Sequence, residues 1–171
     1  MKDKIYKVLV CPKCKSDLEF VLHKEFSCKA CSRRYPVQSG TVNFLSNEIE
    51  VSDIRSIRSK SKFNGLLRKV FMAIKTSHTF KTKRSKNRIP SLINSLEFNE
   101  FSINVGAGNT NYSPEIINID VEATENGDII ADGRNLPVRT GSVSLVISQA
   151  VLEHTPETSL NLAEIERVLK T

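Results

Sequence analysis

Short apolar runs, separated by Gly, Asn, Asp and Pro, mark the C-terminal half of the chain. Each run is rich in β-branched residues and short enough to be one strand of a buried parallel sheet. The pattern therefore predicts an α/β fold with a Rossmann-like sheet of four parallel strands. The runs occupy residues 101–105, 116–119, 128–131 and 143–147.

A helical pattern follows the last of these runs. Apolar residues recur there at intervals of three and four, the spacing of one face of an α-helix. We expect Thr155 to cap this helix and Pro156 to lie in its first turn. The apolar stripe consists of Leu160, Ala163, Ile165, Val168 and Leu169.

The N-terminal part of the chain has a different character, because it is rich in turns and carries all four cysteines. A connector rich in Ser, Lys and Arg separates it from the strand region. We therefore divide the chain into a cysteine-bearing, β-rich unit at residues 1–46, a basic connector at 47–88 and the strand region at 89–171.

The connector contains a second helical pattern, in which basic residues alternate with an apolar stripe. Arg68, Lys69 and Lys75 lie between the apolar positions. This pattern predicts an amphipathic helix, which we expect to pack on a neighbouring domain. The stripe consists of Phe63, Leu66, Leu67, Val70, Phe71 and Ile74.

The positive charge of the protein lies in this connector. Between Arg55 and Arg88 there are twelve Lys or Arg and no Asp or Glu, which leaves 25 − 12 = 13 basic residues against 19 acidic ones elsewhere. The net charge of +6 therefore belongs to one segment. Residues 55–88 are a candidate contact for an anionic partner. That partner is a membrane surface or, through the tract from Lys81 to Arg88, nucleic-acid phosphates.

No run approaches the ~18 apolar residues of a membrane span. The apolar run before Cys11 is too short for the core of a signal peptide. We therefore expect a cytoplasmic protein, in which thiols stay reduced and paired cysteines hold a metal more often than they form disulfides.

The cysteines form two CxxC pairs, Cys11 with Cys14 and Cys28 with Cys31. Each CxxC turn presents two thiolates on one side, so two such turns complete a tetrahedral zinc site. We expect the chain between the pairs to form the hairpin that brings them together. Because four thiolates fill the coordination shell, such a site is structural, and metal binding supplies much of the folding free energy of so small a unit.

Two alternatives stay open for the cysteines. They are structural disulfides and iron in place of zinc. His23 lies between the two pairs, but the shell needs no fifth ligand, so we expect this histidine to face solvent.

The residues around the cysteines sharpen the interpretation. Leu9-Val10-Cys11-Pro12-Lys13-Cys14-Lys15, Cys28-Lys29-Ala30-Cys31-Ser32-Arg33-Arg34-Tyr35-Pro36-Val37 and Gly40 resemble the small zinc-ribbon activator subunit of tRNA and translation-factor methyltransferases. Ser39 stands where that family has an acid. The resemblance implies a module that docks on or stabilises a methyltransferase.

A glycine motif follows the first predicted strand of the C-terminal region, with Gly106, Ala107 and Gly108 in sequence. Glycines there let the backbone turn sharply and approach a ligand closely. Asp120 ends the second strand and Asp132 follows the third. Ligands bind at this edge of a parallel sheet.

The order and spacing of these motifs resemble the class I S-adenosylmethionine-dependent methyltransferases of the type-11 family, over residues 101–170. The resemblance implies that the glycine turn lines the methionine and ribose part of the cofactor, and that Asp120 holds the ribose hydroxyls. Asp132 would accept from the adenine amino group, and the fourth strand end would flank the sulfonium. The cofactor residues implied are Gly106, Ala107, Gly108, Asp120, Val121, Asp132, Gly133, Ser148 and Gln149.

The sequence departs from the family at two points. Asn104 replaces the acid that usually opens the first motif, and Thr110 replaces a small residue. The segment 109–115 is too short for a crossover helix, so we expect a tight loop. A nicotinamide-dependent dehydrogenase fits less well, because its motif needs glycine at Asn111 and an acid about 20 residues beyond the glycines.

We therefore predict methyl transfer from S-adenosylmethionine to an unidentified acceptor. Positioning supplies much of the acceleration of such a displacement and a general base is optional, so no catalytic residue is assigned. Glu153 and His154 lie where a base would, but we expect a structural role for both.

The resemblance implies seven strands in a complete class I domain, and the sequence shows four. We therefore expect the chain to be a fragment of the full enzyme. The alternative function is a non-catalytic zinc-ribbon module that recruits a protein, RNA or membrane partner.

Overall fold

The computed structural model describes residues 3–45, 83–97, 100–155 and 157–171. The chain forms two compact units, one of Met1–Asn47 with Glu97–Thr171 and the other of Glu48–Leu96. The amphipathic helix expected at 63–74 lies outside the described residues. In the second unit the structure describes α3 (Lys83–Asn94), a helix with Pro90 in its interior.

The cysteine-bearing part of the first unit is a small antiparallel sheet preceded by the 3₁₀-helix η1 (Asp3–Lys7). The expected hairpin is confirmed, since β1 pairs with β2 so that Leu18 lies opposite Cys28. Two further antiparallel strands follow along the chain. The four strands are β1 (Leu18–Val21), β2 (Glu25–Cys28), β3 (Arg34–Gln38) and β4 (Thr41–Asn43).

The strand region of the same unit forms the four predicted parallel strands. Their spatial order is β7-β6-β5-β8, so the first strand in the chain lies inside the sheet. The residues between the first two of them include no helix, which confirms the expected tight loop. The strands are β5 (Ser102–Val105), β6 (Ile117–Asp120), β7 (Ile129–Ile130) and β8 (Leu145–Ser148).

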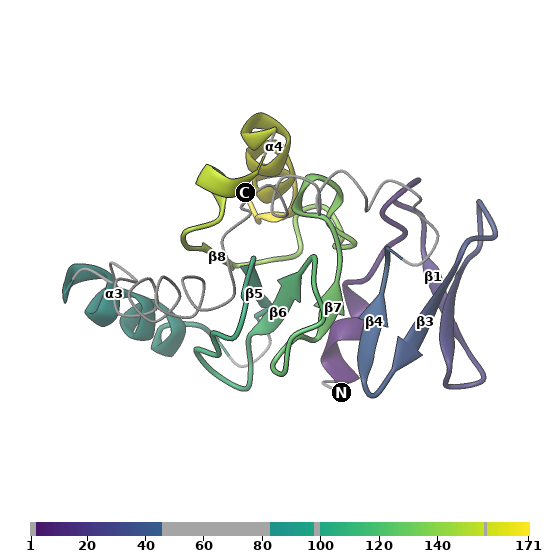
Figure 1. Ribbon diagram of the computed structural model, residues 1–171, viewed down its shortest axis with the longest axis horizontal. Helices are drawn as coiled ribbons and strands as arrows, with labels where there is room; N and C mark the ends of the chain where they lie inside the picture. Colours follow the sequence, from purple (N-terminus) through teal and green to yellow (C-terminus); the bar gives the residue numbers. More distant parts are fainter. Residues whose placement is uncertain (1–2, 46–82, 98–99, 156) are drawn as a thin grey trace, which may run out of the picture. The chain divides into compact units, whose positions relative to one another are not determined.

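The two sets of strands form one continuous sheet, because β4 pairs in parallel with β7. The amide of Val42 donates to the Asp128 carbonyl at 3.1 Å, and the amide of Phe44 donates to the Ile130 carbonyl at 2.8 Å. The Thr41 hydroxyl adds a hydrogen bond to the Gly127 carbonyl at 2.9 Å. In Figure 1, β4 and β3 follow β5, β6 and β7 in the order of the sheet. No motif in the sequence predicted this pairing.

The two faces of the parallel strands differ in polarity. Ile103, Ile119 and Ile129 belong to one face, where they join a core shared with the cysteine-bearing part. The other face carries polar side chains, among them the buried Asn104 and Asn118, which lie opposite each other in β5 and β6. The shared core also contains Ile5, Val8, Leu9, Phe26, Tyr35, Val42, Phe44, Leu136, Val138, Val143 and Val168.

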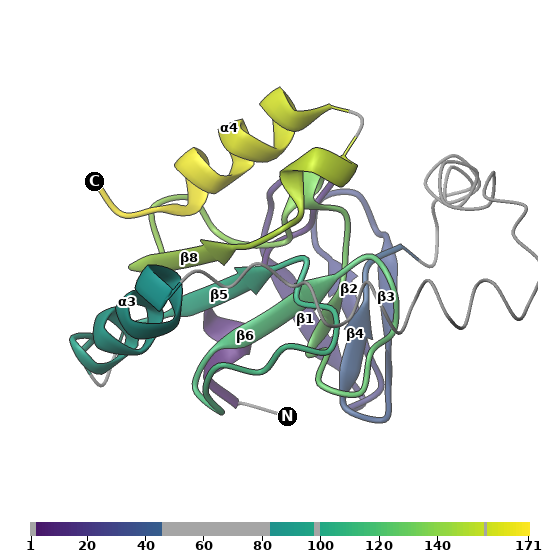
Figure 2. The ribbon, with the colours of Figure 1, turned by 60° about the vertical axis from the view of Figure 1, so that its left-hand side comes forward.

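Three helical segments follow the tips of β7 and β8. They are the 3₁₀-helices η2 (Gly133–Asn135) and η3 (Leu152–His154) and the helix α4 (Thr158–Val168). In the view of Figure 2, α4 lies above β8. None of the helices within the described ranges is long and apolar enough to cross a membrane.

The predicted cap of α4 was wrong. The residue before its first turn is Glu157, and the Thr155 hydroxyl instead donates to the Leu152 carbonyl of η3 at 3.0 Å. The expected apolar stripe is only partly covered, because Val168 is buried whereas Leu160 is exposed.

We predict that Val42→Pro lowers the free energy of unfolding by about 3 kcal/mol, because proline removes the amide that pairs with β7. Val42→Ala is the matched control. It keeps the amide and loses only buried methyl groups, at a cost of about 1–2 kcal/mol. Hydrogen exchange measured by mass spectrometry should show lost protection around residues 128–131 in the proline variant alone. Equal protection in both variants would contradict the role of the pairing.

Candidate cofactor and metal sites

The four cysteines converge at one point of the N-terminal sheet. Their sulfur atoms all lie within 4.8 Å of one another. The shortest separations join Cys14 to Cys28, at 3.4 Å, and Cys11 to Cys31, at 3.6 Å. These distances exceed the bond length of a disulfide, about 2.05 Å, and all four cysteines are free thiols. They are close to the roughly 3.8 Å between sulfurs of a tetrahedral zinc site with Zn–S bonds of about 2.3 Å.

The two CxxC turns are built alike. In each, an amide four residues after the first cysteine donates to that cysteine's carbonyl, from Lys15 at 2.8 Å and from Ser32 at 3.0 Å. Both of these residues have positive φ, 58° and 57° respectively. The repeated backbone turn presents each pair of sulfurs to a common centre, so the donor set fits a structural metal ion with a closed shell.

Polar neighbours contact two of the thiols. Hydrogen bonds from the side chain and backbone of Ser16 lower the pKa of Cys14 to about 6, so this thiol is ionised at neutral pH. The Tyr35 hydroxyl lies 3.1 Å from the sulfur of the buried Cys11. The expected solvent exposure of His23 is supported by its place in the turn between β1 and β2, where its exposed ring contacts Phe20 edge-on.

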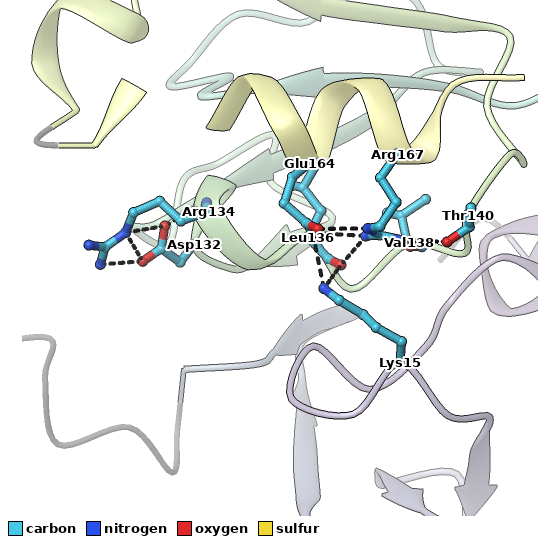
Figure 3. A network of polar contacts seen from close by, with 8 residues as sticks. All are labelled: Lys15, Asp132, Arg134, Leu136, Val138, Thr140, Glu164 and Arg167. Atoms are coloured by element: carbon cyan, nitrogen blue, oxygen red, sulfur yellow. Dashed lines mark hydrogen bonds and ion pairs between the residues drawn. The ribbon is translucent and has the colours of Figure 1, made fainter. Parts of the chain in front are cut away.

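The first cysteine turn also contacts the C-terminal helix. Lys15 follows Cys14 directly, and its ammonium donates to the Glu164 carboxylate of α4 at 3.0 Å and to the Leu136 carbonyl at 3.3 Å. Arg167 donates to both oxygens of the same carboxylate, at 2.6 and 2.8 Å, and to the Leu136 carbonyl at 3.1 Å. Figure 3 shows the three charged side chains meeting below α4. We call this cluster of Lys15, Glu164 and Arg167 the polar staple.

Backbone hydrogen bonds continue this contact. The Val10 amide donates to the Pro137 carbonyl at 3.0 Å, and the Arg139 amide donates to the Val8 carbonyl at 2.8 Å. The Arg139 guanidinium also pairs with Asp17 at 2.7 Å. The segment around the first cysteine turn therefore contacts the chain just beyond η2 as well as α4.

The glycine motif forms the tight turn at the tip of β5. Gly106 and Gly108 both have positive φ, 68° and 52°, which favours glycine at both positions. A Cβ at Gly106 would collide with the side chain of Val151, so the turn packs closely against the chain beyond β8. At Gly108 a Cβ would meet nothing within 4 Å. The turn therefore leaves open space at Gly108.

Asp120 lies beside this turn. One carboxylate oxygen accepts from the Gly108 amide at 2.7 Å, and the other accepts from the Glu122 amide at 3.1 Å. Each carboxylate oxygen has two acceptor sites, so among the described residues one site on each oxygen remains for a ligand. Val121 follows, half-buried, at the end of β6.

Asp132 lies at the third strand tip. Ile130 pairs with Asp120 across β7 and β6, and Asp132 is two residues further along an extended backbone. Strand alternation therefore puts both carboxylates on the same side of the sheet. Gly133 follows and packs against Asn161 of α4.

The fourth strand tip brings Ser148 and Gln149 to the same edge. The hydroxyl of Ser148 is buried and has no hydrogen-bond partner among the residues that the structure describes. The side-chain carbonyl of Gln149 accepts from the Tyr112 hydroxyl at 2.6 Å, which ties the short loop to β8. Glu153 and His154 are exposed within η3.

An amide network that the sequence analysis missed holds the short loop in place of a crossover helix. The side chain of Asn104 donates to that of Asn118 at 3.1 Å, and Asn118 donates to the Asn126 carbonyl at 3.0 Å. Asn126 in turn donates to the Asn109 carbonyl at 3.2 Å. The sequence did contain a signal for this network, because polar residues alternate with apolar ones in β5 and β6, the two strands that the sequence analysis treated as apolar runs.

Comparison with known protein families agrees with this geometry. Residues 105–171 match the family described as a methyltransferase domain, and residues 2–40 match the family described as Trm112p-like protein. No curated protein matches the chain. The chain thus carries type-11 methyltransferase sequence behind an N-terminal zinc ribbon with a four-cysteine cluster.

We predict that the purified protein binds one zinc ion per chain and that Cys28→Ser abolishes this binding, since three thiolates leave the shell open. His23→Ala is the control and should retain one equivalent. Metal released by a thiol-reactive reagent and counted with a chromogenic chelator measures the stoichiometry. Zinc bound at full occupancy by the serine variant would contradict the assignment.

We predict that Glu164→Gln lowers the free energy of unfolding by about 1–3 kcal/mol at pH 7, because two cations lose their charged partner. Burial opposes ionisation of Glu164, but hydrogen bonds from Arg167 and Lys15 outweigh it and lower its pKa. The stabilisation is therefore complete above the unfolded-state value of about 4.3 and is lost as the pH falls through the folded pKa.

Urea unfolding from pH 7 to pH 3 measures this difference. Glu166→Gln, an exposed change on the same helix, should leave both the stability and its pH dependence unchanged. A gap between wild type and Glu164→Gln that stays constant down to pH 3 would argue against the polar staple.

Proposed function

We propose that this chain, in which a zinc ribbon is built into the sheet of a type-11 methyltransferase domain, transfers a methyl group from S-adenosylmethionine to an acceptor. The observation that carries the proposal is the convergence of the glycine turn, Asp120 and Asp132 at one edge of the parallel strands. Class I folds bind their ligands at this edge. When bound, S-adenosylmethionine supplies an electrophilic methyl group on a sulfonium.

The residues at this edge of the sheet would contact different parts of the cofactor. Gly106, Ala107 and Gly108 would line the methionine and ribose part, with the open space at Gly108 admitting the ligand backbone. Asp120 would accept from the ribose hydroxyls with its two remaining acceptor sites, and Val121 would lie against the adenine.

The other two strand tips serve the two ends of the ligand. Asp132 and Gly133 would meet the adenine base. Ser148 and Gln149 would flank the sulfonium. These residues would bind and orient the cofactor, and positioning is the main source of acceleration in such a displacement.

We further propose that the ribbon acts within its own chain. The four thiolates would hold a structural zinc ion, and the metal would stabilise β2, β3 and β4, the last of which pairs with β7. A free-standing recruitment module would leave this edge open for another protein. Here β7 occupies it, so the pairing favours an internal support over the alternative of a non-catalytic recruiting module.

The proposal is tested by calorimetric titration with S-adenosylhomocysteine, the demethylated product. We predict binding by the zinc-loaded protein and at least tenfold weaker binding by Asp120→Asn, in which an amide replaces a charged acceptor. Glu125→Gln makes the same change of charge at an exposed position and should bind as the wild type does. No binding by the folded, zinc-loaded wild type at millimolar ligand would reject the enzyme in favour of the module.

A further inference from the structure

We infer that Arg134 and Glu157 are positioning residues for the Asp132 carboxylate, and that through them the start of α4 controls recognition of the adenine base. This inference rests on the proposed function, because it assigns Asp132 to the base. Neither residue belongs to the motifs that identified the cofactor edge.

Arg134 holds the carboxylate of Asp132 from two sides. Its guanidinium donates to Oδ2 through Nε at 2.9 Å and through the NH2 nitrogen at 2.7 Å, and Nε also reaches Oδ1 at 3.2 Å. Its backbone amide donates to Oδ1 at 2.8 Å. The side chains of Asp132 and Arg134 are only 14% and 25% exposed. A planar guanidinium bound in this way fixes the plane of the carboxylate, which a single point charge does not.

Glu157 links this pair to α4. Its carboxylate accepts from the remaining guanidinium nitrogen of Arg134 at 2.7 Å, and Glu157 is the residue that immediately precedes the helix. The buried Asn161, one turn further on, lies so close to Gly133 that a Cβ there would displace the asparagine side chain. The tip that carries Asp132 is therefore clamped by two contacts from the first turns of α4. Figure 3 shows the Asp132–Arg134 pair at one end of η2, with α4 above.

A carboxylate held in a fixed plane distinguishes adenine from hypoxanthine by the group that each base presents to it. It accepts from the exocyclic amino group of adenine, whereas hypoxanthine would bring a carbonyl oxygen, a second acceptor, against the carboxylate. When the guanidinium of Arg134 is removed, the carboxylate loses the paired hydrogen bonds that fix its plane. Its backbone contact with residue 134 remains, however, so η2 keeps its cap. Loss of discrimination with retention of the fold is therefore the signature of positioning.

The test compares S-adenosylhomocysteine with its hypoxanthine counterpart, S-inosylhomocysteine, by calorimetry on the zinc-loaded full chain. We expect the wild type to prefer the adenine ligand at least tenfold. Arg134→Gln should bind the adenine ligand about tenfold more weakly and reduce the preference to less than about threefold. Arg134→Lys, which keeps the charge without the planar fork, should fall between the two, and Glu157→Gln should lower the preference without abolishing it.

Arg34→Gln is the matched control, because Arg34 forms an exposed ion pair with Glu25 on the ribbon. Its affinity and preference should equal those of the wild type. Thermal unfolding checks that each variant is folded, and if Arg134→Gln is not, the lysine and Glu157 variants decide.

The inference is overturned if the folded Arg134 and Glu157 variants keep the full preference, which would make these contacts purely structural. It is also overturned if Arg134→Gln binds the adenine ligand more tightly, which would make Arg134 a competitor of the base. Wild-type protein that binds neither ligand would instead reject the proposed function itself.

Discussion

The structure depends on the pairing of β4 with β7. An unpaired strand at the edge of a sheet exposes a row of amide and carbonyl groups, and β7 has only two residues with which to hold its place. The amides of Val42 and Phe44 satisfy its outer side, while β6 satisfies its inner side. Since Asp132 follows two residues beyond β7, the geometry of the third strand tip depends on a partner contributed by the other end of the chain.

The metal turns and the cofactor edge are therefore mechanically connected. Four sulfurs converge beside the small sheet that ends in β4, and the turn after Cys14 also places Lys15 against Glu164 of α4. Metal-binding energy is folding energy in a site of this kind. Under the proposed function, that energy would reach the strand tips through one backbone pairing and one polar staple.

Local patterns in the sequence predicted the four parallel strands, the ribbon hairpin and the convergence of the cysteines, because each of these features is encoded within a few neighbouring residues. The exact strand ends moved by one or two residues. Thr155 was assigned to the wrong element, since its hydroxyl is used by η3, which the helical pattern of the next segment did not reveal.

Local sequence patterns did not predict the contacts between distant segments. Lys15 and Glu164 lie 149 residues apart, and nothing in either local sequence marks them as partners. The β4–β7 pairing joins two very short strands with no distinctive composition. Asn104 and Asn118 are different, because their alternation with apolar residues was visible and predicts one polar face on each strand. The individual roles of the cofactor residues remain predictions.

Because the ribbon and the strands it completes belong to one polypeptide, their stoichiometry is always one to one. A separate subunit would need enough affinity to stay bound at its cellular concentration, whereas a tethered partner meets its edge at an effective concentration that can reach the millimolar range. A short pairing such as Val42 and Phe44 against β7 is sufficient under that condition. The pairing therefore needs the correct geometry, but it does not need the binding strength of an interface between separate subunits.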